Sequence, residues 1–170
     1  MRAAALRRRI RLLLGFFIAG LVMSGLTAFP LEWEARVLNR IIGEGTFMEQ
    51  TWPAMAQWIA FVHDGIATTG VAYPFMFYGT DWLAFAHLVI AVAFLGPLKD
   101  PVRNVWVIEF GMIACVLTIP LALVCGPIRG IPLFWRVIDC SFGVVGIVPL
   151  WLARHCVLEL AALAPEGAEP

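Results

Sequence analysis

Five ionisable side chains stand inside long apolar stretches or at their ends, and they are the residues of this sequence most able to do chemistry. They are Asp81, His87, Arg129, Arg136 and Asp139. A charge in such surroundings is costly, so it points by default to a functional site with a partner of opposite charge. Aspartate and histidine can move a proton, and an arginine can hold an anion or a lipid head group.

The residue types suggest two sets of roles. The candidates for catalysis are His87, Asp81 and Asp139, and the candidates for ligand binding are Arg129, Arg136 and Tyr78. On a helix, Asp81 and His87 are separated by roughly 9 Å along the axis and by about 600° around it, so they do not share a face. We therefore expect His87 to need a carboxylate from another helix, and Asp139 is the best candidate.

A structural interpretation explains the same charges and is the favoured one. Arg136 and Asp139 are spaced i, i+3 and can pair within one helix. Asp81 can begin a helix, where the positive end of the helix dipole favours it, or pair with Arg129 or Arg136. Such pairs would hold helices in register. Further along, Glu109 is explained by snorkelling or by a pair with Lys99 or Arg103.

The composition indicates the kind of element that carries these charges. Of the 170 residues, 61% are hydrophobic and only 14% are charged, with twelve basic residues balancing twelve acidic ones. Soluble domains are about 45–50% apolar and about 25% charged. The figures exclude a disordered chain and a nucleic-acid-binding protein, and they argue against a soluble enzyme.

Four segments have the length and apolarity of a membrane span, which is about 20 residues. They are residues 12–29, 82–98, 105–125 and 133–153. The prediction is therefore an all-α integral membrane protein, in which residues 1–170 form a single membrane domain. Its core is a bundle of four transmembrane helices, and the connections after the second span are short enough to favour antiparallel neighbours.

Residues 30–80 form the one long segment between spans, and two helices are expected in it. Trp33, Val37 and Ile41 recur at helical spacing, and so do Trp52, Met55 and Ile59. The second helix would start at Thr46 with Glu49, or at Thr51 with Pro53. We expect both helices to form an outer amphipathic cap. They would cover the bundle or lie at the membrane interface, or they would act as a lid over an outward-facing cavity.

The basic residues orient the bundle. With the N-terminus in the cytoplasm, eight Lys and Arg lie inside and three or four outside, which supports two cytoplasmic termini. A cleaved signal peptide near Thr27–Ala28 is an alternative for the first span. The turns at Gly96–Pro101 and Gly126–Pro132 are expected to join the last three spans, and the tail 161–170 is expected to fray.

No cofactor or metal site is expected. Four cysteines occur without a C-x-x-C pair, although a Cys125–Cys140 bond is conceivable, and only His87 is well placed for a haem. The phosphate-loop, nucleotide and zinc motifs are absent from the sequence.

Three stretches resemble a group of uncharacterised bacterial four-helix membrane proteins. They are Tyr78-Gly-Thr-Asp-Trp-Leu-Ala-Phe-Ala-His87, Gly126-Pro-Ile-Arg-Gly-Ile-Pro132 and Trp135-Arg-Val-Ile-Asp-Cys-Ser-Phe-Gly143. The resemblance covers about residues 73–153. It implies a bacterial inner (plasma) membrane and brings no activity with it.

Two hypotheses about function follow. The first is a partner- or lipid-binding protein, such as an accessory subunit of a membrane complex, because no catalytic motif is present. The alternative is a small membrane enzyme or carrier that acts on a lipid-like substrate in an outward-facing polar pocket, where the charged residues would gather. The expected partners are membrane lipid and another membrane protein, with no nucleic acid. An ion or proton pathway is a third, weaker interpretation.

Overall fold

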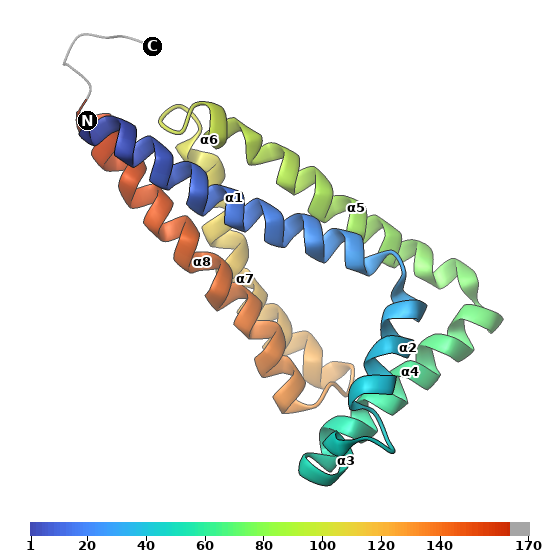
Figure 1. Cartoon of the computed structure of the whole chain (residues 1–170). Coiled ribbons are helices and arrows are strands. Elements are labelled where there is room, and N and C mark those ends of the chain that lie inside the picture. The colour runs from blue at the N-terminus through green and yellow to red at the C-terminus, as the bar shows by residue number, and fades with distance from the viewer. Residues whose placement is uncertain (164–170) are drawn as a thin grey trace. The chain divides into compact units, whose positions relative to one another are not determined.

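The computed structural model describes residues 1–163, and this part of the protein is all-α (Figure 1). The elements are α1 (Arg2–Ala28), α2 (Leu31–Ile42), α3 (Phe47–Thr51), α4 (Pro53–Ala72), a 3₁₀ turn η1 (Pro74–Phe77), α5 (Tyr78–Ala93), α6 (Leu95–Lys99), α7 (Val105–Ile128) and α8 (Leu133–Ala162). The predicted fold class is confirmed.

Four helical segments are long and apolar enough to cross a membrane. They are Arg2–Ala28, Pro74–Lys99, Val105–Ile128 and Leu133–Ala162. The chain is therefore that of a multi-pass membrane protein. The first and last helices extend well beyond the predicted spans, because hydropathy detects only their apolar parts. The buried stripe Leu6, Ile10 and Leu14 keeps the arginine-rich start of α1 packed as helix.

The residue contacts divide the protein into two compact units. One unit contains residues 1–20 and the described residues from 90 onward, and the other contains residues 21–89. The predicted single membrane domain over residues 1–170 stays a prediction.

In the first unit, α7 packs along α8 through glycines (Figure 1). A Cβ atom added at Gly143 would overlap the carbonyl oxygen of Cys115, and one added at Gly146 would lie 2.9 Å from the Cys115 sulfur. On α7, a Cβ atom at Gly111 would lie 2.6 Å from the ring of Phe94. Neither glycine has room for a methyl group, so both are needed for the close approach of the two helices.

In the second unit, α2 packs against α4 (Figure 1). A Cβ atom at Gly70 of α4 would overlap the carboxylate of Glu32, so the two helices touch at this point. The two alternative starts predicted for the second helix fall on two separate helices, and Thr51 ends α3 and does not cap α4, whose N-cap residue is Trp52. The hydroxyl of Thr46 accepts a hydrogen bond of 3.2 Å from the Met48 N–H and caps α3, and Pro53 is the first residue of α4.

Two local predictions were wrong. The chain stays helical through Gly96 to Lys99 as α6, and the turn falls at residues 101–104 instead. The side chain of Asn104 explains the shift, because its Nδ2 atom donates to the Asp100 carbonyl at 2.9 Å and closes the turn there. Ala161 and Ala162 belong to α8 rather than to a frayed tail, and residues 164–170 lie outside the described part of the chain.

Candidate functional site

Two of the six predicted site residues, Tyr78 and Asp81, line one shallow hollow of about 310 Å³ in the second unit. Its other lining residues are Phe29, Trp82 and Phe85. Four of the five come from one face of α5, because positions 78, 81, 82 and 85 follow the i, i+3, i+4, i+7 spacing of a helix. Phe29 follows the last residue of α1 and completes the hollow.

The aromatic rings of the hollow are arranged edge to face along α5. The ring centroids of Tyr78 and Trp82 are 6.0 Å apart at an interplanar angle of 82°. Those of Trp82 and Phe85 are 5.9 Å apart at 90°. This geometry is favourable between ring quadrupoles. All three rings are more than half exposed, so their faces are open to a ligand or to lipid.

Asp81 is the only charged group in the lining of this hollow. Its side chain is half-buried in the first turn of α5, where the helix dipole favours a negative charge. Among residues 1–163 it forms neither a hydrogen bond nor an ion pair. A carboxylate without a basic partner beside aromatic rings is an arrangement that suits a cation.

Sequence reasoning missed Phe29, Trp82 and Phe85 as members of this site. The helical spacing of Tyr78, Trp82 and Phe85 was a usable signal. Aromatic residues at the end of a span are, however, usually interpreted as anchors at the membrane interface. Phe29 carried no signal, because only the approach of α1 to α5 brings it to the hollow.

His87 lies where α1 approaches α5, within the second unit. A Cβ atom at Gly25 would lie 3.2 Å from the His87 Cβ and 2.9 Å from the carbonyl oxygen of Ala84. The Nδ1 atom of His87 is 2.8 Å from the Leu83 carbonyl oxygen, to which it donates a hydrogen bond. This nitrogen therefore needs no carboxylate, and a pairing of His87 with Asp139 stays a prediction.

The remaining predicted residues, Arg129, Arg136 and Asp139, belong to the first unit. The expected i, i+3 pair between Arg136 and Asp139 is not formed within the described residues. The stem of Arg136 instead packs on Gly126 of α7, at a position that a Cβ atom would occupy, and its Nε atom is buried there without a hydrogen-bond partner. Arg129 follows the end of α7 and is exposed.

A set of ion pairs that the sequence did not predict joins the ends of three helices of the first unit. Glu109 of α7 accepts a hydrogen bond of 2.8 Å from Arg154 Nε of α8, so the expected pairing with Lys99 or Arg103 was wrong. The reason is that α7 and α8 run side by side at this point.

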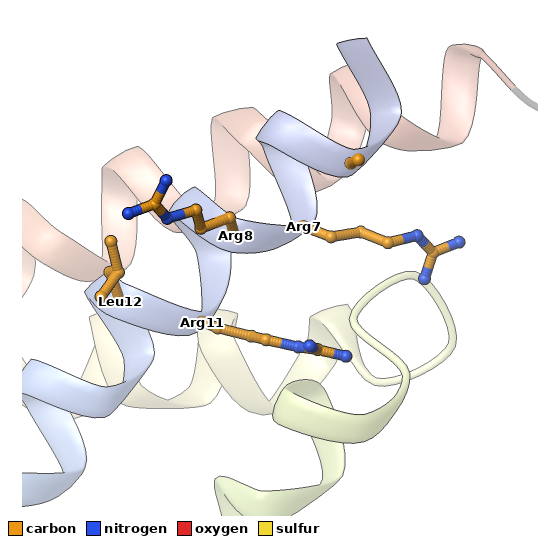
Figure 2. Close-up of a pocket in the computed structure, with 5 residues that line it drawn as sticks. Arg7, Arg8, Arg11 and Leu12 are labelled. Atoms are coloured by element: carbon orange, nitrogen blue, oxygen red, sulfur yellow. The ribbon is translucent and has the colours of Figure 1, made fainter. Parts of the chain in front are cut away.

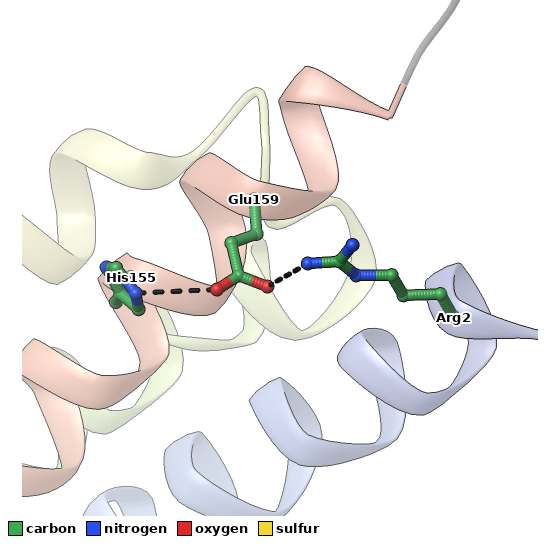
Figure 3. A network of polar contacts seen from close by, with 3 residues as sticks. All are labelled: Arg2, His155 and Glu159. Atoms are coloured by element: carbon green, nitrogen blue, oxygen red, sulfur yellow. Dashed lines mark ion pairs between the residues drawn. The ribbon is translucent and has the colours of Figure 1, made fainter.

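Nearby, Glu159 of α8 contacts two basic groups, as Figure 3 shows. Its Oε2 atom is 3.6 Å from Arg2 at the start of α1, and its Oε1 atom is 3.4 Å from His155. The ring of His155 stacks on Trp151 with centroids 6.2 Å apart. The i, i+4 spacing of His155 and Glu159 was a usable signal, whereas the contact with Arg2 spans almost the whole chain.

All four cysteines are free thiols, so the conceivable Cys125–Cys140 bond is absent. Within residues 1–163, no three His, Cys, Asp or Glu side chains gather closely enough to hold a metal ion.

No family model matches the chain, and no curated protein or solved structure matches it either. The resemblance to bacterial four-helix membrane proteins therefore stays an expectation. The fold defines a small multi-pass integral membrane protein.

Proposed function

We propose that this protein binds membrane lipid without transforming it, and that the hollow of Phe29, Tyr78, Asp81, Trp82 and Phe85 takes the cationic head group of a zwitterionic phospholipid. The observation that carries the proposal is the carboxylate of Asp81, which has no basic partner among the described residues and lies among aromatic rings. An ammonium or quaternary ammonium group placed on ring faces and near a carboxylate is stabilised by both.

The position of the hollow supports a lipid rather than a soluble ligand. It lies where one apolar helix ends at Ala28 and the next apolar segment begins at Pro74. Consecutive spans meet the same membrane surface at these two ends, which is where lipid head groups are found. Aromatic side chains favour this depth because one part of each ring is apolar and its rim is polar.

We further propose that this surface is the outer one and that both ends of the chain are cytoplasmic, in a bacterial inner membrane. The support is the distribution of basic residues, of which eight fall on one side of the four spans and three or four on the other. A topology of this kind would place the hollow in the outer leaflet.

The test is a lipid-dependent stability measurement on the purified protein in nanodiscs of phosphatidylcholine, phosphatidylethanolamine or phosphatidylglycerol. The full chain has other lipid-facing surfaces, so the readout is the stabilisation that a substitution in the hollow removes in each lipid. We expect this loss to be larger in the two zwitterionic lipids than in the anionic lipid. Asp81→Asn should weaken that stabilisation about fivefold in apparent affinity, because an exposed ionic contact contributes about 1 kcal/mol. Trp82→Leu should weaken it about two- to fivefold.

Two matched variants serve as controls. Glu44→Gln removes an exposed carboxylate elsewhere in the same unit, and Trp106→Leu removes a tryptophan that is 61% exposed, against 57% for Trp82. If the controls weaken lipid stabilisation as much as the site variants do, the hollow is an ordinary part of the lipid-facing surface. Native mass spectrometry adds a second readout. A stoichiometric protein partner in place of lipid would favour the accessory-subunit hypothesis. A chemically altered lipid would favour the hypothesis of a membrane enzyme.

A further inference from the structure

The first turns of α1 carry five arginines, and four of them have no acidic partner among residues 1–163. They are Arg2, Arg7, Arg8, Arg9 and Arg11. Within the described part of the chain only Arg2 forms an ion pair, with Glu159. All five side chains are exposed. Four unpaired guanidinium groups on less than two turns of helix repel one another, so an anion from outside the chain would be stabilised there.

The packing of α1 fixes the direction in which these arginines point. Leu6, Ile10 and Leu14 are 8%, 1% and 0% exposed and form the buried stripe of the helix. A shallow groove of about 310 Å³ lies on another face, lined by Ala4, Arg7, Arg8, Arg11 and Leu12. Figure 2 shows the side chains of Arg7 and Arg11 extending to the same side of α1, while Arg8 extends to the other side.

On the side of Arg8, the surface of α1 changes from basic to apolar within one turn. Leu12 and Phe16 continue the direction of the groove at i+4 spacing from Arg8, and they are 65% and 64% exposed. An anion held at the arginines would therefore sit beside a surface suited to hydrocarbon. A free phosphate would use only the first part of this surface, whereas a phospholipid would use both parts.

We propose that Arg7 and Arg11 clamp the phosphate of an anionic phospholipid, with Arg8 adding charge and with an acyl chain lying along Leu12 and Phe16. Arginine suits this role because its planar guanidinium donates two parallel hydrogen bonds to phosphate oxygens. The site lies in the first unit and prefers the opposite head-group charge to the hollow on α5, so it does not depend on the proposed function.

The test compares nanodiscs of phosphatidylglycerol and phosphatidylcholine with soluble inorganic phosphate, using the full chain. We expect phosphatidylglycerol to raise the thermal midpoint at low salt and inorganic phosphate to leave it unchanged. Arg7→Gln with Arg11→Gln should weaken the effect of phosphatidylglycerol by roughly 25-fold, because each basic residue near an anionic surface contributes about fivefold. Raising the salt concentration should shrink this difference through screening.

The matched control is Arg9→Gln with Arg40→Gln, which removes the same charge from exposed positions outside the groove. An equal loss in the control would show that net charge, and not the clamp, attracts the lipid, and would overturn the proposal. Stabilisation by inorganic phosphate alone, equal to that by phosphatidylglycerol, would overturn it as well. The effect of substitutions in the α5 hollow is measured in phosphatidylcholine, and the effect of the arginine substitutions is measured in phosphatidylglycerol. One proposal can therefore fail while the other holds.

Discussion

Replacing Gly143 by alanine tests the glycine contact between α7 and α8. The new methyl group would overlap the carbonyl oxygen of Cys115, which is main chain and cannot rotate away. Forcing extra volume into a packed contact costs about 1–3 kcal/mol. Alanine also gains about 1 kcal/mol over glycine in a helix, so the net loss should be about 0–2 kcal/mol.

The control is Gly15→Ala in α1, where nothing lies within 4 Å of an added Cβ atom. Gly15→Ala should raise the free energy of unfolding by about 1 kcal/mol, because alanine has a higher helix propensity than glycine. The two variants should therefore differ by about 1–3 kcal/mol, which is roughly a 5- to 150-fold difference in the folded-to-unfolded ratio. Equilibrium unfolding in mixed micelles, followed by tryptophan fluorescence, measures this difference.

A second substitution separates a side-chain clash from a main-chain clash. A methyl group at Gly146 would lie 2.9 Å from the Cys115 sulfur, so Cys115→Ala should relieve part of the cost of Gly146→Ala. The same change should not relieve Gly143→Ala. A coupling of about 0.5 kcal/mol or more is expected for the first pair and none for the second. Equal stability of Gly143→Ala and Gly15→Ala would refute the packing argument.

Three further predictions concern other parts of the chain. In a double-mutant cycle of Glu109→Gln and Arg154→Gln, a coupling of up to about 1 kcal/mol is expected for this half-exposed pair, and a value near zero would contradict the contact. Thr46→Ala should lower the stability of the second unit by about 1 kcal/mol, because the α3 cap is lost. Hydrogen exchange measures this change. The control Thr51→Ala removes only hydrogen bonds within α3 and should lower the stability less. In a cysteine-free background, Ile66→Cys should react with an impermeant thiol reagent on intact cells, and reaction only after lysis would reverse the proposed topology.

The helices of this protein could be predicted because their signals are local. Apolar length identified the spans, and the spacing of Trp33, Val37 and Ile41 predicted α2. Thr46 and Pro53 marked two helix starts for reasons of hydrogen bonding that act within a few residues. The extent of α1 was underestimated, because arginines interrupt its apolar pattern while Leu6 and Ile10 keep it buried.

The pairing of charges could not be predicted in the same way. Arg136 has a carboxylate one turn away, yet its stem packs on Gly126 because a glycine on the neighbouring helix leaves space for it. Glu109 pairs with Arg154, which is 45 residues away, rather than with the nearer Lys99 or Arg103. The partner of each charged side chain depends on which helices pack together and on which residues lie at the same level of the two helices. A sequence pattern within one helix does not contain that information.

The contact between Arg2 and Glu159 also concerns the order in which the chain is made. Arg2 of α1 contacts Glu159 of α8, and α1 leaves the ribosome before α8, so α1 must wait until α8 has been made before this neighbour exists. At synthesis rates of about 5–20 residues per second, that wait is roughly 10–30 s. During this time the Leu6, Ile10 and Leu14 stripe needs another apolar surface, either lipid or an insertion factor. Assembly of the first unit therefore cannot be completed before α8 has left the ribosome.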